Sequence, residues 1–296
     1  MTPRRRKTGG TENSDRLALR PVKVGAVQMS VSEDMGSNLR KAELMVSKAA
    51  AQGAEVVCLP ELFAWRYFPS SRSSKPVPQT IPGPVSNALS SWARRDKVVL
   101  VGGSLYEVSG RRRYNTSMVF DENGRTLSKY RKVHLPQDDH YFEQDYFSPG
   151  SRYVVAKSGR GRVGTLICFD QWYPEPARAE RLMGAEMIFY PTAIGWVEGV
   201  EPVEGDWKAA WEAVQVGHAI SNSVVVCAVN RVGVEGGTKF WGGSFVADQF
   251  GKVLHRAGGG EETFVVTCNL ALGEAVEEGW GFMRNRRGAT YSRLAR

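Results

Sequence analysis

The feature of this sequence that most limits its fold is an internal repeat. Four segments in the first part of the chain resemble four segments in the second part, and the pairs occur in the same order. One such pair could arise by chance, but four in order indicate a duplicated structural unit. The pairs are "VGAVQ" at 24–28 with "VGTLI" at 163–167, "GAEVVCLP" at 53–60 with "GAEMIFYP" at 184–191, "VVLVGGS" at 98–104 with "VVVCAVN" at 224–230, and "SMVFDENGRTL" at 117–127 with "SFVADQFGKVL" at 244–254.

Each half follows the pattern strand, helix, strand, helix, strand and hairpin. The strand segments are short, β-branched and continuously apolar, which is typical of sheets covered by helices. The turns "DENG" and "DQFG" place glycine where a hairpin needs a positive φ. Helices are expected over 37–52, 85–95, 174–184 and 206–222. The predicted fold class is therefore α/β, with two half-sheets packed face to face as a four-layer α-β-β-α sandwich, and the pseudo-two-fold repeat running from about residue 21 to 285.

The net charge of +8 is concentrated at the two ends of the chain. Residues 1–20 carry +4 and residues 280–296 carry +5, which leaves −1 for residues 21–279. A nucleic-acid-binding domain usually has its basic residues on one folded face, so nucleic acid is not the expected partner. We expect residues 1–20, which are polar and lack aromatic side chains, to form a disordered basic tail before one domain over 21–296.

The sequence also shows no sign of a membrane or secretory segment. No apolar run is long enough to span a bilayer, and no apolar core follows the basic residues at the N-terminus. We therefore expect a cytoplasmic protein without a membrane partner.

The four cysteines divide into two kinds. Cys58, Cys227 and Cys268 lie inside apolar β-rich runs, as buried core thiols do. Cys168 instead lies where the apolar strand in "GTLICFDQWYPE" ends and polar and aromatic residues follow. The cysteines form no CxxC pair and the four histidines show no metal-ligand spacing, so neither a zinc site nor a thioredoxin-type redox motif is expected.

The repeat also shows where the two halves differ. Glu61 follows its strand in "LPELF", but the matching position in "YPTAI" is Thr192. Cys168 and Lys132 likewise have no counterpart of the same chemistry in the other half. Because α/β proteins bind ligands beyond the carboxyl ends of their strands, these three residues are candidates for a functional site.

Together these residues could carry out thiol chemistry on an amide-like carbon. Such an attack needs a nucleophile, a base and positive charge for the oxyanion, which Cys168, Glu61 and Lys132 could supply. We expect the lysine to lower the pKa of the thiol. Taken singly, however, Cys168 could be a core thiol, Glu61 a carboxylate at a helix N-terminus, and Lys132 a surface cation.

Three motifs in the expected order resemble those of the nitrilase superfamily, the carbon–nitrogen hydrolases. They are "LPELF", "YRKVHLP" and "GTLICFDQWYPE", and "HYFEQDYFSPG" resembles the segment bearing that family's second glutamate. The resemblance extends from residue 22 to about 291 and implies the same four-layer sandwich. It implies that Cys168 is the nucleophile, Glu61 the general base and Lys132 the stabiliser of the tetrahedral intermediate. It further implies that Glu143 positions the substrate, that the Phe169 N–H is an oxyanion donor, and that a thioester-like intermediate forms without a cofactor.

The same resemblance suggests a substrate class. The branch acting on N-carbamoyl amino acids has an arginine shortly after the cysteine, whereas "CFDQWYPE" resembles the branch acting on N-carbamoylputrescine. The acidic residues of loop 137–145 could attract the ammonium group of such an amine, or could simply be a solvated loop. Phe169, where the family usually has tryptophan, and "RRGATY" near the C-terminus depart from the family pattern. Candidate substrate-binding residues, of which each aromatic could equally be core, are Tyr67, His134, Gln171, Trp172 and Ala193.

Two alternatives to a carbamoyl-amine hydrolase stay open at this point. One is an amidase, nitrilase or β-ureidopropionase activity on another small substrate. The other is a non-catalytic scaffold or nucleic-acid-binding protein that uses the basic tail, which the intact Glu61, Lys132 and Cys168 oppose. The resemblance also implies a homo-oligomer, a dimer or larger, whose interface the C-terminal arm with Trp280, Phe282 and Arg286 would cross.

Overall fold

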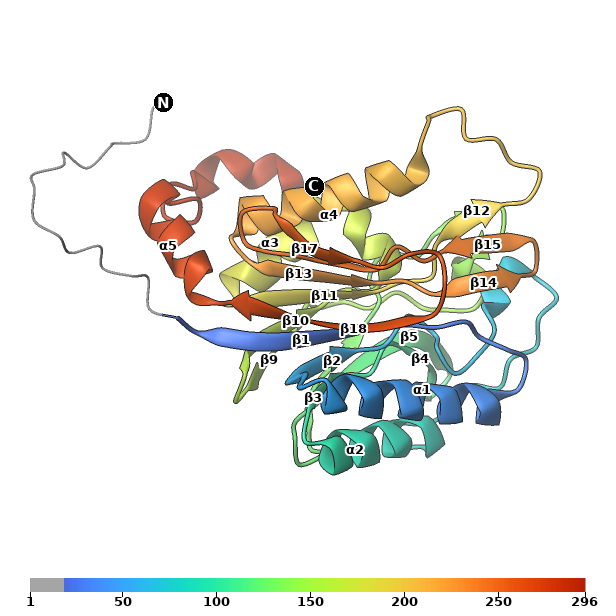
Figure 1. Ribbon diagram of the computed structural model, residues 1–296. Helices are drawn as coiled ribbons and strands as arrows, with labels where there is room; N and C mark the ends of the chain where they lie inside the picture. Colours follow the sequence, from blue (N-terminus) through green and yellow to red (C-terminus); the bar gives the residue numbers. More distant parts are fainter. Residues whose placement is uncertain (1–18, 296) are drawn as a thin grey trace, which may run out of the picture.

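The computed structural model describes residues 19–295, which form two sheets stacked face to face with helices on both outer faces (Figure 1). The first sheet has the strand order β18-β1-β2-β3-β5-β4, with β6 also paired to β5. Its strands are β1 (Pro21–Gln28), β2 (Val56–Cys58), β3 (Val99–Val101), β4 (Leu105–Ser109), β5 (Arg112–Phe120), β6 (Thr126–Arg131) and β18 (Glu262–Asn269).

The second sheet repeats this arrangement. Its order is β17-β16-β13-β11-β10-β9. Strands β10, β11 and β13 are parallel, as are β1, β2 and β3, and in both sheets antiparallel strands flank the parallel trio. The pseudo-two-fold repeat predicted from the sequence is thereby confirmed. The strands are β9 (Val155–Ser158), β10 (Gly161–Thr165), β11 (Met187–Pro191), β13 (Val225–Val229), β16 (Phe245–Ala247) and β17 (Val253–Arg256).

Helices cover the outer face of each sheet, and the four predicted helices are all present. Helices α1 and α2 pack below the first sheet, and α3 and α4 pack above the second (Figure 1). In the hairpins, Gly124 and Gly251 have φ of 77° and 86°, as the turn sequences predict. The helices are α1 (Met35–Ala51), α2 (Pro84–Asp96), α3 (Pro174–Leu182), α4 (Trp207–Asn222) and α5 (Ala271–Trp280), with short 3₁₀ turns η1 (Phe68–Ser70), η2 (Glu143–Asp145), η3 (Cys168–Trp172) and η4 (Gly288–Ala295).

The apolar core has three layers because side chains alternate along each buried strand. Val56 and Cys58 of β2 point between the sheets, whereas Val57 points toward α1 and α2. In β11, Phe189 points between the sheets and Tyr190 toward α3 and α4. Cys227 and Cys268 join Cys58 between the sheets, so these three cysteines are core thiols as predicted.

Smaller strands extend one end of the sandwich, where the loops after the central strands meet. They are β12 (Gly195–Val197), β14 (Val232–Glu235) and β15 (Thr238–Trp241) in one sheet, and β7 (Gln137–Asp138) and β8 (Tyr141–Phe142) in another. These strands enclose the site described below.

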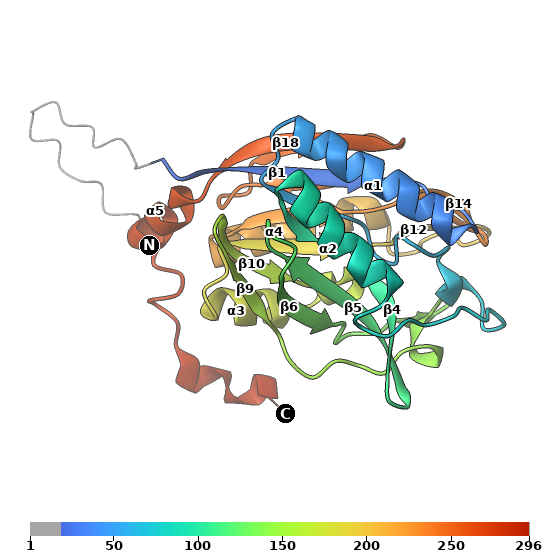
Figure 2. The ribbon, with the colours of Figure 1, turned by 90° about the horizontal axis from the view of Figure 1, so that it is seen from below.

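The two ends of the described chain lie at the edge of the sandwich (Figure 1 and Figure 2). The predicted basic tail lies outside the described residues up to residue 18; Arg20 is described, and its side chain pairs with Glu186 and Glu274. At the other end, α5 and η4 project from the body (Figure 2), and Trp280 is 48% exposed. The predicted homo-oligomer stays a prediction. Over residues 19–295 no helix has both the length and the apolar character that a membrane crossing requires.

Candidate active site

Cys168 is the first residue of the 3₁₀ turn η3, at a sharp backbone turn shortly after the end of β10. Its φ is +44°, in the left-handed region that residues other than glycine rarely adopt. Strained backbone of this kind persists only where the surrounding structure holds it, and it concentrates at functional sites. The thiol is 5% exposed and contacts the Ala193 carbonyl oxygen at 3.9 Å. The turn thus presents a single cysteine side chain at the end of a central strand.

Glu61 lies on a second constrained loop, after β2. Leu62 has a φ of +47°, and its N–H donates to the Ser104 hydroxyl at 2.9 Å. Gly103 passes so close beneath this loop that a Cβ there would lie 2.2 Å from the Pro60 carbonyl oxygen. From the other half of the repeat, the buried Arg231 donates to the Glu61 carbonyl oxygen at 2.5 Å. Both halves of the chain therefore fix the backbone that carries Glu61.

Lys132 follows β6 and lies between two carboxylates. Its Nζ is 2.9 Å from Glu61 Oε1 and 2.7 Å from both carboxylate oxygens of Glu143. All three side chains have 0% exposure. Asn115 donates to Glu61 Oε1 at 2.7 Å, and the Tyr67 hydroxyl donates to Glu143 Oε1 at 2.7 Å. The second oxygen of Glu61, Oε2, is buried and has no hydrogen-bond partner among the described residues, so it is free to accept a proton.

Several groups act on the pKa of the Cys168 thiol. Burial raises this pKa well above its ordinary value and Glu61 raises it further, whereas Lys132 lowers it, as expected from the sequence. The net shift is upward because the cysteine is buried and faces more negative than positive charge. A neutral thiol needs a base before it can attack, and Glu61 is the carboxylate with an open oxygen.

The pKa values of the two other groups also follow from burial and pairing. Burial lowers the pKa of Lys132, but Glu143 and Glu61 outweigh it, so the pKa is raised and the ammonium stays charged. Burial raises the pKa of Glu143 to about 7, Lys132 opposes that shift, and Glu61 adds to it. One cation between two carboxylates leaves a negative charge that protonation of Glu143 would remove.

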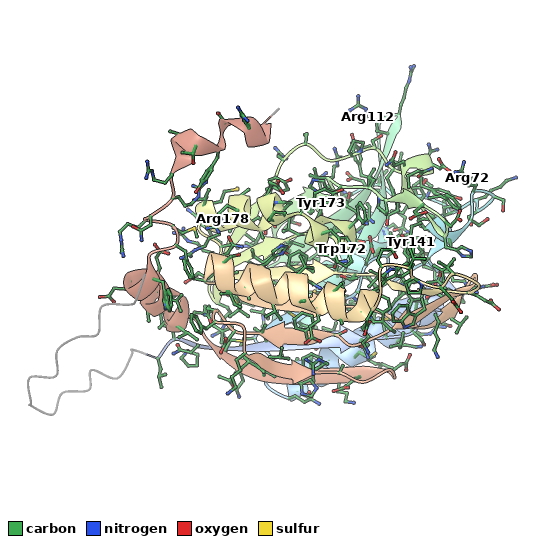
Figure 3. The ribbon with its side chains drawn as sticks, turned by 90° about the horizontal axis from the view of Figure 1, so that it is seen from above. Arg72, Arg112, Tyr141, Trp172, Tyr173 and Arg178 are labelled. Carbon is green, nitrogen blue, oxygen red and sulfur yellow. The ribbon has the colours of Figure 1, made fainter. Side chains whose placement is uncertain are left out.

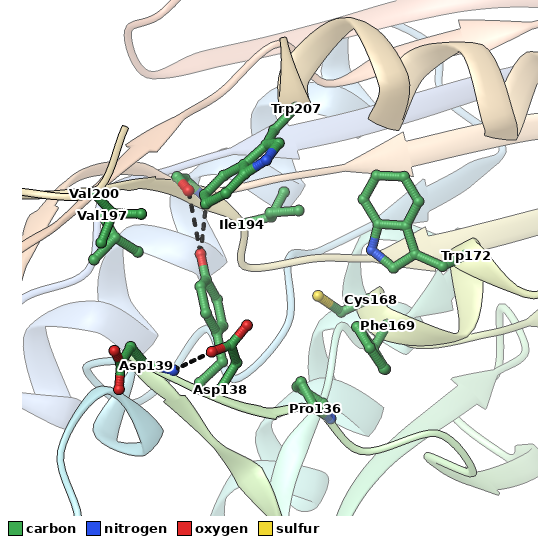
Figure 4. Close-up of a pocket in the computed structure, with 12 residues that line it drawn as sticks. Pro136, Asp138, Asp139, Cys168, Phe169, Trp172, Ile194, Val197, Val200 and Trp207 are labelled. Carbon is green, nitrogen blue, oxygen red and sulfur yellow. Dashed lines mark hydrogen bonds between the residues drawn. The ribbon is translucent and has the colours of Figure 1, made fainter. Parts of the chain in front are cut away.

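A cavity of about 270 Å³ opens onto Cys168. Figure 4 shows the thiol pointing into it, with Trp172 on one side and Asp138 and Asp139 across the space. Trp172 and Tyr141 also lie near each other in the view from above (Figure 3). Among the described residues, those that line the cavity include no lysine or arginine. The lining residues are Pro136, Asp138, Asp139, Tyr141, Cys168, Phe169, Trp172, Ile194, Gly195, Val197, Val200 and Trp207.

Some residues proposed from the sequence for substrate binding lie elsewhere. Trp172 lines the cavity, but Gln171 is fully buried and accepts from the Trp211 indole at 2.9 Å. His134 stacks on Tyr173, with 3.8 Å between the ring centroids, and its Nδ1 contacts Asp170.

The remaining proposed residues lie next to Cys168 or the cluster around Lys132. Tyr67 lies behind the cavity, where its hydroxyl donates to Glu143. Ala193 contributes its carbonyl oxygen beside the thiol. The side chain of Phe169 lines the cavity, and its backbone N–H comes directly after Cys168, the residue with the positive φ.

Sequence reasoning missed several contributors to the site. Asn115 lies inside β5, where nothing in the sequence distinguishes it from a core polar residue. Tyr141 could have been found, because it lies two residues before Glu143 in a quoted motif; its hydroxyl contacts Gly195. Trp207 is the first residue of α4, and it lines the cavity only because the tertiary structure brings the start of this helix close to Cys168.

In residues 19–295 no cluster of three or more His, Cys, Asp or Glu side chains could hold a metal ion.

Comparisons with known proteins show which family and fold the chain resembles. The family model described as carbon–nitrogen hydrolase matches residues 23–278. A citrullinase from Francisella tularensis subsp. tularensis is 35% identical over 93% of this chain and 98% of its own. An N-carbamoylputrescine amidase from Solanum lycopersicum is 34% identical over 93% and 95%, respectively. The crystal structure of a carbon–nitrogen hydrolase from Helicobacter pylori G27 superposes with a TM-score of 0.85 at 31% identity, covering 93% of this chain and 99% of that one.

Proposed function

The chain belongs to the carbon–nitrogen hydrolase family, and from this premise we propose that it hydrolyses a carbamoyl amine with a distal ammonium group, such as N-carbamoylputrescine. The observation that carries the proposal is the lining of the cavity at Cys168. It combines two carboxylates, Asp138 and Asp139, with the aromatic side chains of Trp172 and Trp207. Carboxylates attract an ammonium group, and aromatic faces bind cations and the apolar chain between the two ends.

The first half of the reaction forms a covalent intermediate. Glu61 accepts the thiol proton on its open Oε2 while the sulfur of Cys168 adds to the carbamoyl carbon. The Lys132 ammonium and the Phe169 N–H stabilise the oxyanion that develops. The tetrahedral intermediate collapses, the C–N bond breaks, and Glu61 returns the proton to the departing nitrogen. The product at this stage is a thioester-like intermediate on Cys168 and a free amine or ammonia.

Water completes the cycle at the same residues. Glu61 accepts a proton from water as the water oxygen adds to the carbonyl carbon. The C–S bond then breaks and the sulfur regains a proton. The carbamic acid that leaves decomposes to carbon dioxide and the second nitrogen product. Glu143 keeps Lys132 in place throughout, since both of its oxygens are 2.7 Å from Nζ.

The relative named citrullinase makes citrulline the second candidate substrate. Citrulline and N-carbamoylputrescine both carry a carbamoyl group and a distal ammonium, but citrulline adds a carboxylate. Such a carboxylate would lie near Asp138 and Asp139 without a lysine or arginine among the described lining residues to pair with it. The cavity therefore favours the amine without a carboxylate.

A substrate panel tests the proposal. Ammonia release would be compared for N-carbamoylputrescine, citrulline, N-carbamoyl-β-alanine and a simple aliphatic amide. We expect the highest kcat/KM for N-carbamoylputrescine. A higher kcat/KM for citrulline or N-carbamoyl-β-alanine would overturn the substrate class, and activity on the aliphatic amide alone would assign the chain to the amidases of the family.

A further inference from the structure

Asp170 lies two residues after Cys168, and it contacts neither the cavity nor the cluster around Lys132. Its carboxylate has 0% exposure and lies within hydrogen-bond distance of three donors and one imidazole nitrogen. Oδ2 accepts from the Ile167 N–H at 2.9 Å and from the Tyr130 hydroxyl at 2.7 Å. Oδ1 accepts from the His134 N–H at 3.0 Å and contacts His134 Nδ1 at 2.8 Å. A buried carboxylate is tolerated only when it is this fully hydrogen-bonded.

The groups that donate to Asp170 lie close in sequence to the two proposed catalytic residues, Cys168 and Lys132. Ile167 immediately precedes Cys168, so this bond anchors the left-handed turn that presents the thiol. Tyr130 and His134 lie two residues before and two residues after Lys132. A single carboxylate therefore ties the nucleophile's turn, which belongs to the second half of the repeat, to the lysine's segment, which belongs to the first.

The chemistry of these contacts requires a carboxylate. Burial raises the pKa of the Tyr130 phenol well above its ordinary value, so this hydroxyl stays a donor. The two N–H groups can only donate. An asparagine at this position would place an NH₂ group, which can only donate, against groups that also donate. At least one of these donors would then have no acceptor.

We propose that Asp170 is a positioning residue that fixes the Cys168 thiol relative to the Lys132 ammonium. Its effect on turnover rests on the proposed function, but its effect on the thiol does not. Because catalysis depends on near-ångström placement, misplacement of about 1 Å costs roughly 10²-fold in rate.

Two variants and one matched control test this role. Asp170→Asn replaces one of the two acceptor oxygens with an NH₂ group, so the groups that faced that oxygen lose their acceptor. Tyr130→Phe leaves Asp170 in place and removes a single hydroxyl, which donates to Asp170 and accepts from the Val133 N–H. Tyr190→Phe is the matched control: Tyr190 is equally buried in the same core layer, but its hydroxyl contacts His218 and not Asp170.

The primary readout is alkylation of Cys168 by iodoacetamide at several pH values, located by mass spectrometry. A changed position relative to Lys132 and its two carboxylates would change the pH at which the thiol ionises, so the alkylation profile of Tyr130→Phe should shift along the pH axis while that of Tyr190→Phe matches wild type. On the proposed substrate, kcat should fall roughly three- to tenfold in Tyr130→Phe and by about 10²-fold in Asp170→Asn. KM should change little, because Asp170 does not line the cavity.

The outcomes separate this inference from the proposed function. A shifted alkylation profile in Tyr130→Phe supports positioning even if wild type hydrolyses no carbamoyl amine. Profiles of Tyr130→Phe and Tyr190→Phe that both match wild type would overturn it, whether or not Asp170→Asn folds. Equal losses of kcat in the two tyrosine variants would also overturn it, because they would indicate a general packing effect.

Discussion

Lys132 binds Glu143 through both carboxylate oxygens, each 2.7 Å from Nζ, and neither side chain is exposed to solvent. The same ammonium contacts Glu61 at 2.9 Å. A single cation thus neutralises one of two buried carboxylates, and Glu61 retains an oxygen with no partner among the described residues. This arrangement holds a base and a cation together beside a thiol that is itself neutral.

The charge balance of the cluster predicts a pH dependence of stability. Burial raises the pKa of Glu143 from 4.5 to about 7. A carboxyl whose pKa is raised by folding contributes stability that is complete below its unfolded pKa and is lost as pH rises through its folded pKa. Relative to Glu143→Gln, wild type should therefore lose about 3 kcal/mol of unfolding free energy between about pH 4.5 and just above pH 7. Denaturant unfolding of both proteins across this range checks the prediction, and parallel curves would contradict it.

Removal of the cation should affect both stability and activity. Lys132→Met leaves Glu61 and Glu143 buried without a cation, which should destabilise the fold by about 3–5 kcal/mol. It should also abolish hydrolysis, because the oxyanion loses its charged donor. Lys157→Met, at an exposed lysine on β9, is the control and should stay within about 0.5 kcal/mol of wild type. Urea unfolding and ammonia release measure the two effects. A stable and active Lys132→Met protein would contradict the assignment.

Arg231 should prove necessary for the loop that carries Glu61. It pairs with Glu235 at 2.9 Å, donates to the Glu61 carbonyl oxygen, and Glu235 in turn accepts from the Tyr67 N–H at 2.7 Å. Arg231→Met should cost about 3–5 kcal/mol of unfolding free energy, because it leaves Glu235 buried and unpaired. Arg256→Met removes a surface arginine from its pair with Glu212 and should cost no more than about 1 kcal/mol. Equal losses in the two variants would show that Arg231 does not fix this loop.

The acidic side of the cavity should set substrate preference. Asp138→Asn and Asp139→Asn should each raise KM for N-carbamoylputrescine several-fold, because each removes a negative charge near the substrate ammonium. Neither change should alter KM for a neutral amide. Asp145→Asn, in the same acidic loop but not among the residues lining the cavity, should leave both values unchanged. Steady-state kinetics at low ionic strength would test this, and equal effects on the charged and neutral substrates would disprove it.

Much of the fold could be predicted because the same order of strands and helices occurs in both halves of the repeat. The apolar runs around Val57 and Ile188 form strands in equivalent positions of the two sheets, and a helix follows the first strand of each half. Cys168 could be singled out because its apolar run stops at the cysteine, whereas the runs around Cys58 and Cys227 continue into the core. The boundary of each half was therefore visible in the sequence without any structure.

The features that the sequence did not predict depend on tertiary placement. The net shift of the thiol pKa depends on burial and on the balance of carboxylates, and neither can be read from the order of motifs. Gln171 follows the nucleophile closely, but the turn at Cys168 directs it toward Trp211 and not into the cavity. Asn115 reaches Glu61 only because β5 passes beside the loop after β2. Such contacts join residues far apart in the chain and leave no local signal.

The proposed role of Cys168 as the nucleophile of a carbamoyl-amine hydrolase can be tested by ammonia release from N-carbamoylputrescine. The proteins to compare are wild type, Cys168→Ala and Cys58→Ala, since Cys58 is a core thiol with 0% exposure. We expect release by wild type and Cys58→Ala and none above background by a folded Cys168→Ala protein. Equal release by Cys168→Ala and wild type would contradict it.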